Sequence, residues 1–131
     1  MTTLENVATD ATLAEQRIVA GIEWAEAEHL AGLLVVPISR LAELLQIPPA
    51  TMARRKTQGR FTVEESEKIV RFARLWFIAC QAVGGAAGAR SWLKRAQYGL
   101  NGRVPLEVAR LEVGARSVEA LLQRIHYGVL A

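Results

Sequence analysis

Residues 62–85 constrain the fold more than any other part of this 131-residue chain. They open on Thr62-Val63-Glu64-Glu65, where the threonine hydroxyl can accept from the third amide while Glu65 reaches back to cap the helix start. Residues 69–82 are apolar at nearly every position, as in a helix at the centre of a core or of a dimer interface. Gly84-Gly85 then stops the helix. The pattern therefore predicts a long central helix that ends near residue 83.

The rest of the chain also has helical periodicity, and no stretch alternates like a strand. Before the central helix we predict one helix from a Thr12–Glu15 capping box to Leu33 or Leu34, a short one over 38–45, and another over 49–56 that Gly59 ends. After it we predict helices over 86–96, 105–111 and 113–126, while residues 1–11 fray. The predicted fold class is all-α, with an N-terminal helix-turn-helix region (1–61) followed by a small helical domain (62–131).

The composition excludes several classes of protein. With 51% apolar residues the chain can bury a core, which excludes general disorder. Cys80 is the only cysteine, so a disulfide framework and a multi-cysteine metal site are excluded and a reducing compartment is favoured. The N-terminus lacks the basic and apolar regions of a signal peptide, and no uncharged apolar run approaches the roughly 20 residues that span a bilayer. We expect a cytoplasmic protein with no membrane association.

Catalysis by the chain itself is not expected. Neither His29 nor His126 has a nucleophile partner in its sequence context, and Cys80 lies in an apolar helix where cysteines are usually inert. The glycines of residues 84–88 lack both a preceding strand and the Walker lysine, so they do not form a phosphate loop. We predict no catalytic residues, no metal and no cofactor.

Basic charge is concentrated in and just after the second of two predicted short helices. Residues 1–33 hold six acids against one arginine, whereas residues 50–60 hold four basic residues and no acid. Two short helices joined by Gln46-Ile47-Pro48, the second of them basic, fit a helix-turn-helix that places its second helix in the major groove. Arginine can bind guanine with two hydrogen bonds, while lysine more often contacts phosphates. The predicted DNA-binding residues are Thr51, Arg54, Arg55, Lys56 and Arg60.

Two features qualify this prediction. Residues 51–56 contain no Asn, Gln or Ser to read adenine, so we expect modest sequence specificity. Helix-turn-helix proteins commonly gain affinity by binding two half-sites, so we also expect a homodimer. The alternative is that the basic run is only a solvated helix face, because short helix pairs occur in any all-helical protein.

The C-terminal residues have the character of a binding surface. An amphipathic helix is followed at once by the apolar run Tyr127-Gly128-Val129-Leu130-Ala131, which suggests a partner that buries it. Aromatic and arginine side chains, the types enriched at interface hot spots, gather in the same region. They are Trp92, Arg95, Tyr98, Arg103, Arg124 and Tyr127. The alternative for Trp92 and Tyr98 is a place in the core.

Several of these segments together resemble the Xre/MbcA/ParS-type antitoxins and their C-terminal toxin-binding domain. The resemblance lies in Ser91-Trp92-Leu93, the turn over residues 100–106, Gly114 shortly before Val118, and the closing residues 124–128, and it extends back through residues 60–72. Two positions depart from the family pattern, because Val104 and Leu111 stand where threonine is common. Either threonine would cap a helix, a contribution of about 1 kcal/mol.

The resemblance implies a specific partner and mechanism. Antitoxins of this type II kind pair with a RES-domain toxin that degrades NAD or transfers ADP-ribose, and they occlude its active site with their C-terminal end. They also bind operator DNA to regulate their own transcription. The implied toxin-binding set adds Gly128, Val129, Leu130 and Ala131 to the six residues above. We hypothesise that Val129 and Leu130 fill the cleft while the terminal carboxylate pairs with an arginine of the toxin.

Two other functions remain open at this point. A dimeric helix-turn-helix regulator without a toxin partner would use its C-terminal helices for dimerisation or for a ligand. A helical adaptor would bind no DNA and would tolerate loss of the basic residues at 54–56.

Overall fold

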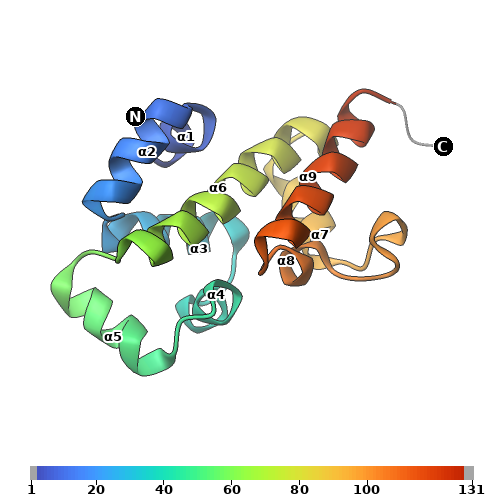
Figure 1. The fold of residues 1–131 in the computed structure, drawn as a ribbon. Helices are drawn as coiled ribbons and strands as arrows, with labels where there is room; N and C mark the ends of the chain where they lie inside the picture. Colours follow the sequence, from blue (N-terminus) through green and yellow to red (C-terminus); the bar gives the residue numbers. More distant parts are fainter. Residues whose placement is uncertain (1–2, 129–131) are drawn as a thin grey trace. The chain divides into compact units, whose positions relative to one another are not determined.

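The computed structural model describes residues 3–128, and the regular elements in that range are helices (Figure 1). In chain order they are α1 (Thr3–Thr9), α2 (Ala11–Ala20), α3 (Trp24–Leu34), α4 (Ile38–Leu45), α5 (Pro49–Gln58), α6 (Val63–Val83), α7 (Ala86–Lys94), a 3-10 turn η1 (Tyr98–Leu100), α8 (Pro105–Val108) and α9 (Glu112–His126). The predicted all-α class is confirmed. Two isolated bridges, Glu23 with Arg60 and Gln97 with Arg103, are the β-type pairings found in this range.

The chain forms two compact units, the first running through Arg74 and the second starting at Leu75. The division lies within α6, so one helix supplies core residues to both units. The boundary predicted from the sequence, between residues 61 and 62, instead falls just before this helix.

The start of α6 has the predicted capping geometry. The Thr62 amide donates to Glu65 Oε1 at 2.9 Å, and the Glu65 amide donates to Thr62 Oγ1 at 3.2 Å.

Over residues 3–128, no single helix combines the length and apolarity needed to cross a bilayer. The pair α6 and α7 meets those criteria only jointly, and it is bent by 113° at its junction.

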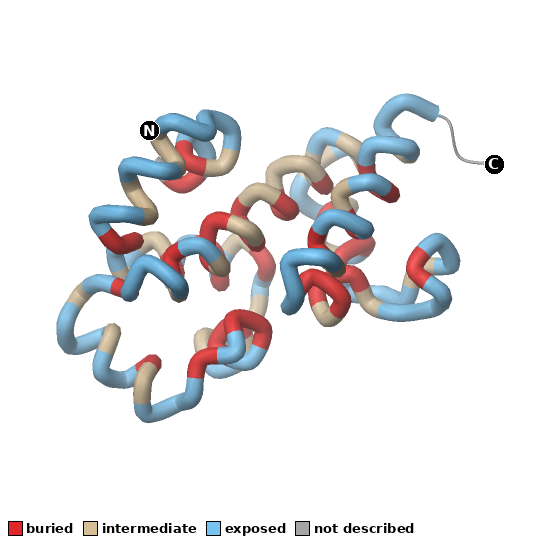
Figure 2. Tube along the Cα trace, viewed as in Figure 1, coloured by how far each residue is buried: buried red, intermediate tan, exposed pale blue. Residues whose placement is uncertain are grey.

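The core of the first unit includes leucines of α3 and α4 and apolar side chains of the first half of α6. Burial of each such side chain contributes about 1.5–3 kcal/mol relative to its exposure. Figure 2 shows the buried segments of these helices in red. The buried side chains include Leu30, Leu34, Leu41, Leu44, Leu45, Ile69 and Phe72. The sequence predicted fraying at the start of the chain. The structure instead has the helix α1 there, and its Leu4 and Val7 side chains are buried.

The single helix predicted from Thr12 to Leu34 is wrong. The structure has α2 and α3 instead, separated by residues 21–23. Gly21 has φ +88°, and a side chain there would lie 2.6 Å from the carbonyl oxygen of Phe61. The Ile22 amide donates to the buried Ser66 hydroxyl at 2.8 Å, which ties this break to α6. The Thr12 cap is also wrong, since the Asp10 carboxylate accepts from the first amides of α2.

The core of the second unit includes side chains of the second half of α6, of α7 and of α9. Its buried side chains include Leu75, Trp76, Leu93, Val118 and Leu122. The Arg90 guanidinium lies 5.6 Å from the centre of the Trp76 ring, in a cation–π arrangement. Trp92 is 9% exposed and therefore belongs to this core.

A close contact fixes the junction between α8 and α9. A side chain at Gly114, in the first turn of α9, would place its Cβ 1.9 Å from the carbonyl oxygen of Val108. That distance is far below van der Waals contact, so only glycine fits without moving one helix.

This contact predicts that Gly114→Ala destabilises the protein by about 1–3 kcal/mol, the usual cost of overpacking a core. The matched control is Gly32→Ala, in α3, because a Cβ there meets no atom within 4 Å. Alanine at position 32 should be neutral or stabilising by up to about 1 kcal/mol through helix propensity. Urea unfolding followed by circular dichroism measures both changes, and equal stabilities for the two variants contradict the packing explanation.

Candidate functional site

The two short helices form the predicted helix-turn-helix within the first unit. α4 has its predicted bounds, and α5 runs two residues beyond the predicted end, to Gln58. Gln46 adopts a left-handed conformation with φ +58°, and the Ile47 amide then bonds back to the Ala42 carbonyl at 2.9 Å. Ile47 and Met52 are buried, which fixes the turn and the inner face of α5.

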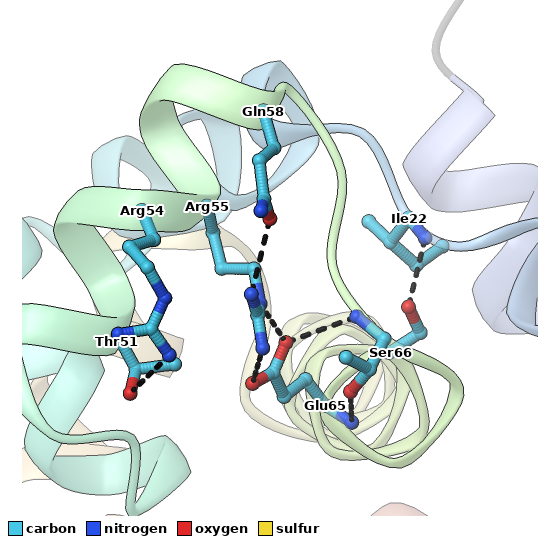
Figure 3. Close-up of polar contacts among 8 residues, drawn as sticks. Ile22, Thr51, Arg54, Arg55, Gln58, Glu65 and Ser66 are labelled. Carbon is cyan, nitrogen blue, oxygen red and sulfur yellow. Dashed lines mark hydrogen bonds and ion pairs between the residues drawn. The ribbon is translucent and has the colours of Figure 1, made fainter.

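One face of α5 is open to solvent. Ala50, Arg54 and Thr57 follow each other at intervals of four and three residues, so they share a face, and all three are exposed. Met52 lies on the opposite face and is buried. At the edge of the exposed face, Arg54 Nη2 lies 3.4 Å from the hydroxyl of the half-buried Thr51 (Figure 3). The predicted DNA-binding residues do not include Ala50 and Thr57, although helical spacing counted from Arg54 places both on the same face.

Arg55 points to the start of α6 instead (Figure 3). Its Nε donates to Glu65 Oε1 at 2.7 Å and its Nη2 to Glu65 Oε2 at 3.1 Å, in a bidentate pair. Its Nη1 donates to Gln58 Oε1 at 3.0 Å. The Arg55 and Glu65 side chains are only 14% and 13% exposed. Of the predicted DNA-binding residues, Arg55 therefore serves first to hold α5 against α6.

Arg60 is also engaged within the first unit. Its Nη1 donates to the Gly21 carbonyl at 2.7 Å and its Nη2 to Glu23 Oε2 at 3.2 Å. The Arg60 side chain stays about half exposed, so a phosphate contact remains sterically open. These two hydrogen bonds join Arg60 to Gly21 and Glu23, the residues at which the chain breaks between α2 and α3.

Lys56 borders a hollow beside the helix pair. This hollow has a volume of about 530 Å³ and is lined by α3, α4 and α5. Its wall includes Trp24, Ile38, Ala42, Met52 and Lys56. The Trp24 ring stacks on Phe61 with centroids 5.6 Å apart. Lys56 is exposed, but it lies to the side of the stripe formed by positions 50, 54 and 57.

In the second unit, the residues predicted to bind the toxin divide into exposed and buried groups. Tyr98 is 99% exposed and Tyr127 is 71% exposed, whereas Trp92 is in the core. The arginines Arg95, Arg103 and Arg124 are exposed. Gly128 is exposed with φ +69°, while Val129, Leu130 and Ala131 lie outside the described residues.

The segment from Gln97 to Arg103, here called the Tyr98 loop, has a closed backbone. The Gln97 amide donates to the Arg103 carbonyl at 3.1 Å, and the Gly102 amide donates back to the Gln97 carbonyl at 2.9 Å. Leu100 is buried, and Asn101 and Gly102 have positive φ angles of 58° and 78°. The loop is therefore a defined turn anchored in the second unit.

Within residues 3–128, no group of three or more His, Cys, Asp or Glu side chains is arranged to hold a metal ion. Cys80 is half-buried and is not part of a disulfide.

The Arg55–Glu65 pair predicts a dependence of stability on pH. Burial raises the pKa of Glu65, whereas hydrogen bonds from Arg55 and Thr62 lower it. The lowering is the larger effect, so the pKa of Glu65 lies below its ordinary value. A carboxylate with a depressed folded-state pKa contributes stability that is present above its unfolded pKa of about 4.3 and is lost as the pH falls through the folded pKa. Glu65→Gln removes this contribution, so the variant should lose less stability than the wild type between about pH 7 and pH 3.

Urea midpoints at both pH values measure this difference. Glu64→Gln is the matched control, because it removes the neighbouring, exposed carboxylate and should behave as the wild type. A Glu65→Gln variant that loses as much stability as the wild type on acidification contradicts the proposed role of the pair.

Comparison with known proteins agrees with this arrangement. The family model described as "Antitoxin Xre-like helix-turn-helix domain" matches residues 13–74. The model described as "Antitoxin Xre/MbcA/ParS C-terminal toxin-binding domain" matches residues 79–128. These two ranges correspond closely to the two structural units.

Two curated relatives carry the same name. The chain is 37% identical over 98 residues to Antitoxin Xre of Yersinia enterocolitica, covering 73% of this chain and 66% of that protein. It is 35% identical over 75 residues to Antitoxin Xre of Photorhabdus laumondii, covering 56% of this chain and 51% of that protein. The matches therefore span less than two thirds of each relative's length. The two domain models match this chain one after the other, in the order that the sequence resemblance implies. The chain therefore belongs to the Xre/MbcA/ParS antitoxin family.

Proposed function

We propose that this protein is the antitoxin of a type II toxin–antitoxin system and that it acts without catalysis or a cofactor. The observation that carries the proposal is the presence of two separate units on one chain. The first matches an antitoxin helix-turn-helix domain and the second matches a toxin-binding domain. A chain built this way can hold a toxin and DNA at the same time, in the cytoplasm where both occur.

The proposed partner of the second unit is a RES-domain toxin that consumes NAD or transfers ADP-ribose from it. The C-terminal end, from Tyr127 onward, occludes the active site of that toxin. Support comes from the exposed Tyr127 at the end of α9 and from the exposed Arg124 one turn earlier. An exposed aromatic ring and arginine favour a protein interface.

The proposed partner of the first unit is operator DNA, bound by a homodimer. The exposed stripe of α5, with Arg54 at its centre, is shaped to enter a major groove. Arg54 either binds guanine or neutralises a phosphate, and Thr57 and Thr51 offer hydroxyl groups beside it. Since Arg55 is bound to Glu65, Arg54 and Lys56 are the proposed sources of most of the electrostatic attraction of α5.

The two activities together would couple toxin level to transcription. While antitoxin is present, it blocks the toxin and occupies the operator. When antitoxin is degraded, the toxin is released by mass action and the promoter opens.

A dimeric helix-turn-helix regulator without a toxin partner is the alternative function. The first unit favours it, because the helix-turn-helix lies wholly within this unit, which has buried side chains of its own.

The α5 stripe predicts the effect of Arg54→Ala on DNA binding. Loss of one arginine contact should weaken binding to the promoter region upstream of the protein's own gene by about 10-fold. If Arg54 contacts a phosphate, the slope of log affinity against log salt should fall by about one unit. Arg116→Ala is the matched control, because it removes the same charge from the second unit. Equal binding by the two variants, measured by fluorescence anisotropy over a salt series, argues against α5 as the DNA-contacting helix.

The proposed role of the C-terminal end predicts the behaviour of a protein that stops at His126. Co-expressed with the product of the adjoining reading frame, the full chain should restore both growth and cellular NAD. The shortened protein should restore neither, because it leaves the active site open. Rescue by the shortened protein refutes occlusion by this end, and a neighbouring product that is harmless alone favours the regulator.

A further inference from the structure

The Tyr98 loop places an aromatic side chain almost completely in solvent. The Tyr98 ring is 99% exposed, although the second unit has a core of its own. A tyrosine usually buries part of its ring, because its apolar area is large. Of the large apolar or aromatic side chains on the described surface, Tyr98 is the most exposed.

The loop does not depend on this ring for its own structure. The Leu100 side chain anchors it in the core, and Gly99 lies so close to α9 that an added Cβ would come within 2.8 Å of Leu121. The Gln97 side chain donates to the Trp92 carbonyl at 2.9 Å, which ties the loop to the end of α7. These contacts hold the backbone at both sides of Tyr98, so the ring is presented from a fixed base.

Basic residues stand before and at the end of the loop in the sequence. Arg95 precedes the loop and is exposed, and Arg103 closes it. Arg103 Nε donates to the Leu100 carbonyl at 3.1 Å, which orients a guanidinium that remains exposed. Residues 75–131 as a whole hold seven Lys and Arg against three Glu, so their surface is complementary to an acidic partner.

We infer that the Tyr98 loop is an anchor for the toxin that acts independently of the C-terminal end. The inference rests on the proposed antitoxin function and names a second contact within it. The ring of Tyr98 enters an apolar pocket on the toxin, outside the active site, and acidic side chains around that pocket meet Arg95 and Arg103. A rigid aromatic presented this way loses little conformational entropy on binding, which favours it as a hot spot.

A protein partner fits the position of this loop better than DNA does. Stacking of a base on Tyr98 would also use an exposed ring and nearby arginines. The loop, however, lies within the range matched by the toxin-binding domain, and the helix-turn-helix match ends at residue 74.

The anchor makes binding and neutralisation separable. Isothermal titration of the full chain against the purified product of the adjoining reading frame gives the reference affinity. Tyr98→Ala should weaken this affinity at least about 10-fold, as expected for loss of a hot-spot residue. Tyr98→Phe keeps the ring and should bind almost as the wild type does. A chain that stops at His126 keeps the loop, so it should still bind the toxin while failing to neutralise it.

Two controls and three outcomes define the test. Val19→Ala removes another exposed side chain, in the first unit, and should change nothing. The midpoint temperature of thermal unfolding should be the same for all variants, because Tyr98 is not part of the core. Wild-type affinity for Tyr98→Ala, or complete loss of binding in the shortened chain, overturns the anchor while leaving the antitoxin function intact. Weaker binding of Tyr98→Ala to promoter DNA, with unchanged toxin binding, would assign the loop to DNA. No binding by the wild-type chain overturns the proposed function itself.

Discussion

The Glu65 carboxylate determines how α5 is held against α6. Its Oε1 accepts from the Thr62 amide and from Arg55, and its Oε2 accepts from Arg55 as well. One side chain therefore caps the long helix and fixes the orientation of α5. Because a bidentate arginine–carboxylate pair tolerates little rotation, it holds the exposed face of α5 in one direction. A helix of ten residues that buries only Met52 has few other contacts that can do this.

This use of Arg55 changes how the basic run of α5 is interpreted. Three adjacent basic residues point in three directions, since neighbours on a helix are separated by about 100°. Arg54 faces solvent, Arg55 binds Glu65, and Lys56 borders the hollow between α3, α4 and α5. A count of basic residues therefore overstates the charge available to DNA, and the residues through position 74 even hold ten acids against nine Lys and Arg. Attraction to DNA depends on where the charges lie and not on their sum.

The sequence predicted the elements whose signals are local. The Thr62 cap, the proline at the start of α5 and Gly59 after it all act within a few residues, and α4, α5 and α6 were predicted close to their observed bounds. The break at Gly21 was missed because it depends on Phe61 and Ser66, about forty residues away in the chain. Composition alone could not separate the buried Trp92 from the exposed Tyr98, because both are aromatic and lie in similar surroundings in the sequence. Only the path of the backbone through Leu100 and Gly99 distinguishes them.

The proposed anchor outside the toxin's active site would also explain how a short C-terminal segment suffices for the proposed inhibition. A few apolar residues have little affinity for a cleft by themselves, since ordering them costs much of the free energy that their burial provides. Once the Tyr98 loop is bound, the segment after α9 meets the cleft as part of the same complex. Its effective concentration is then in the millimolar range, as for short linkers, which is enough for a weak ligand to occupy its site most of the time. In this proposal the loop supplies the affinity for the toxin, and the C-terminal segment then needs only enough affinity for the cleft to occupy it within the complex.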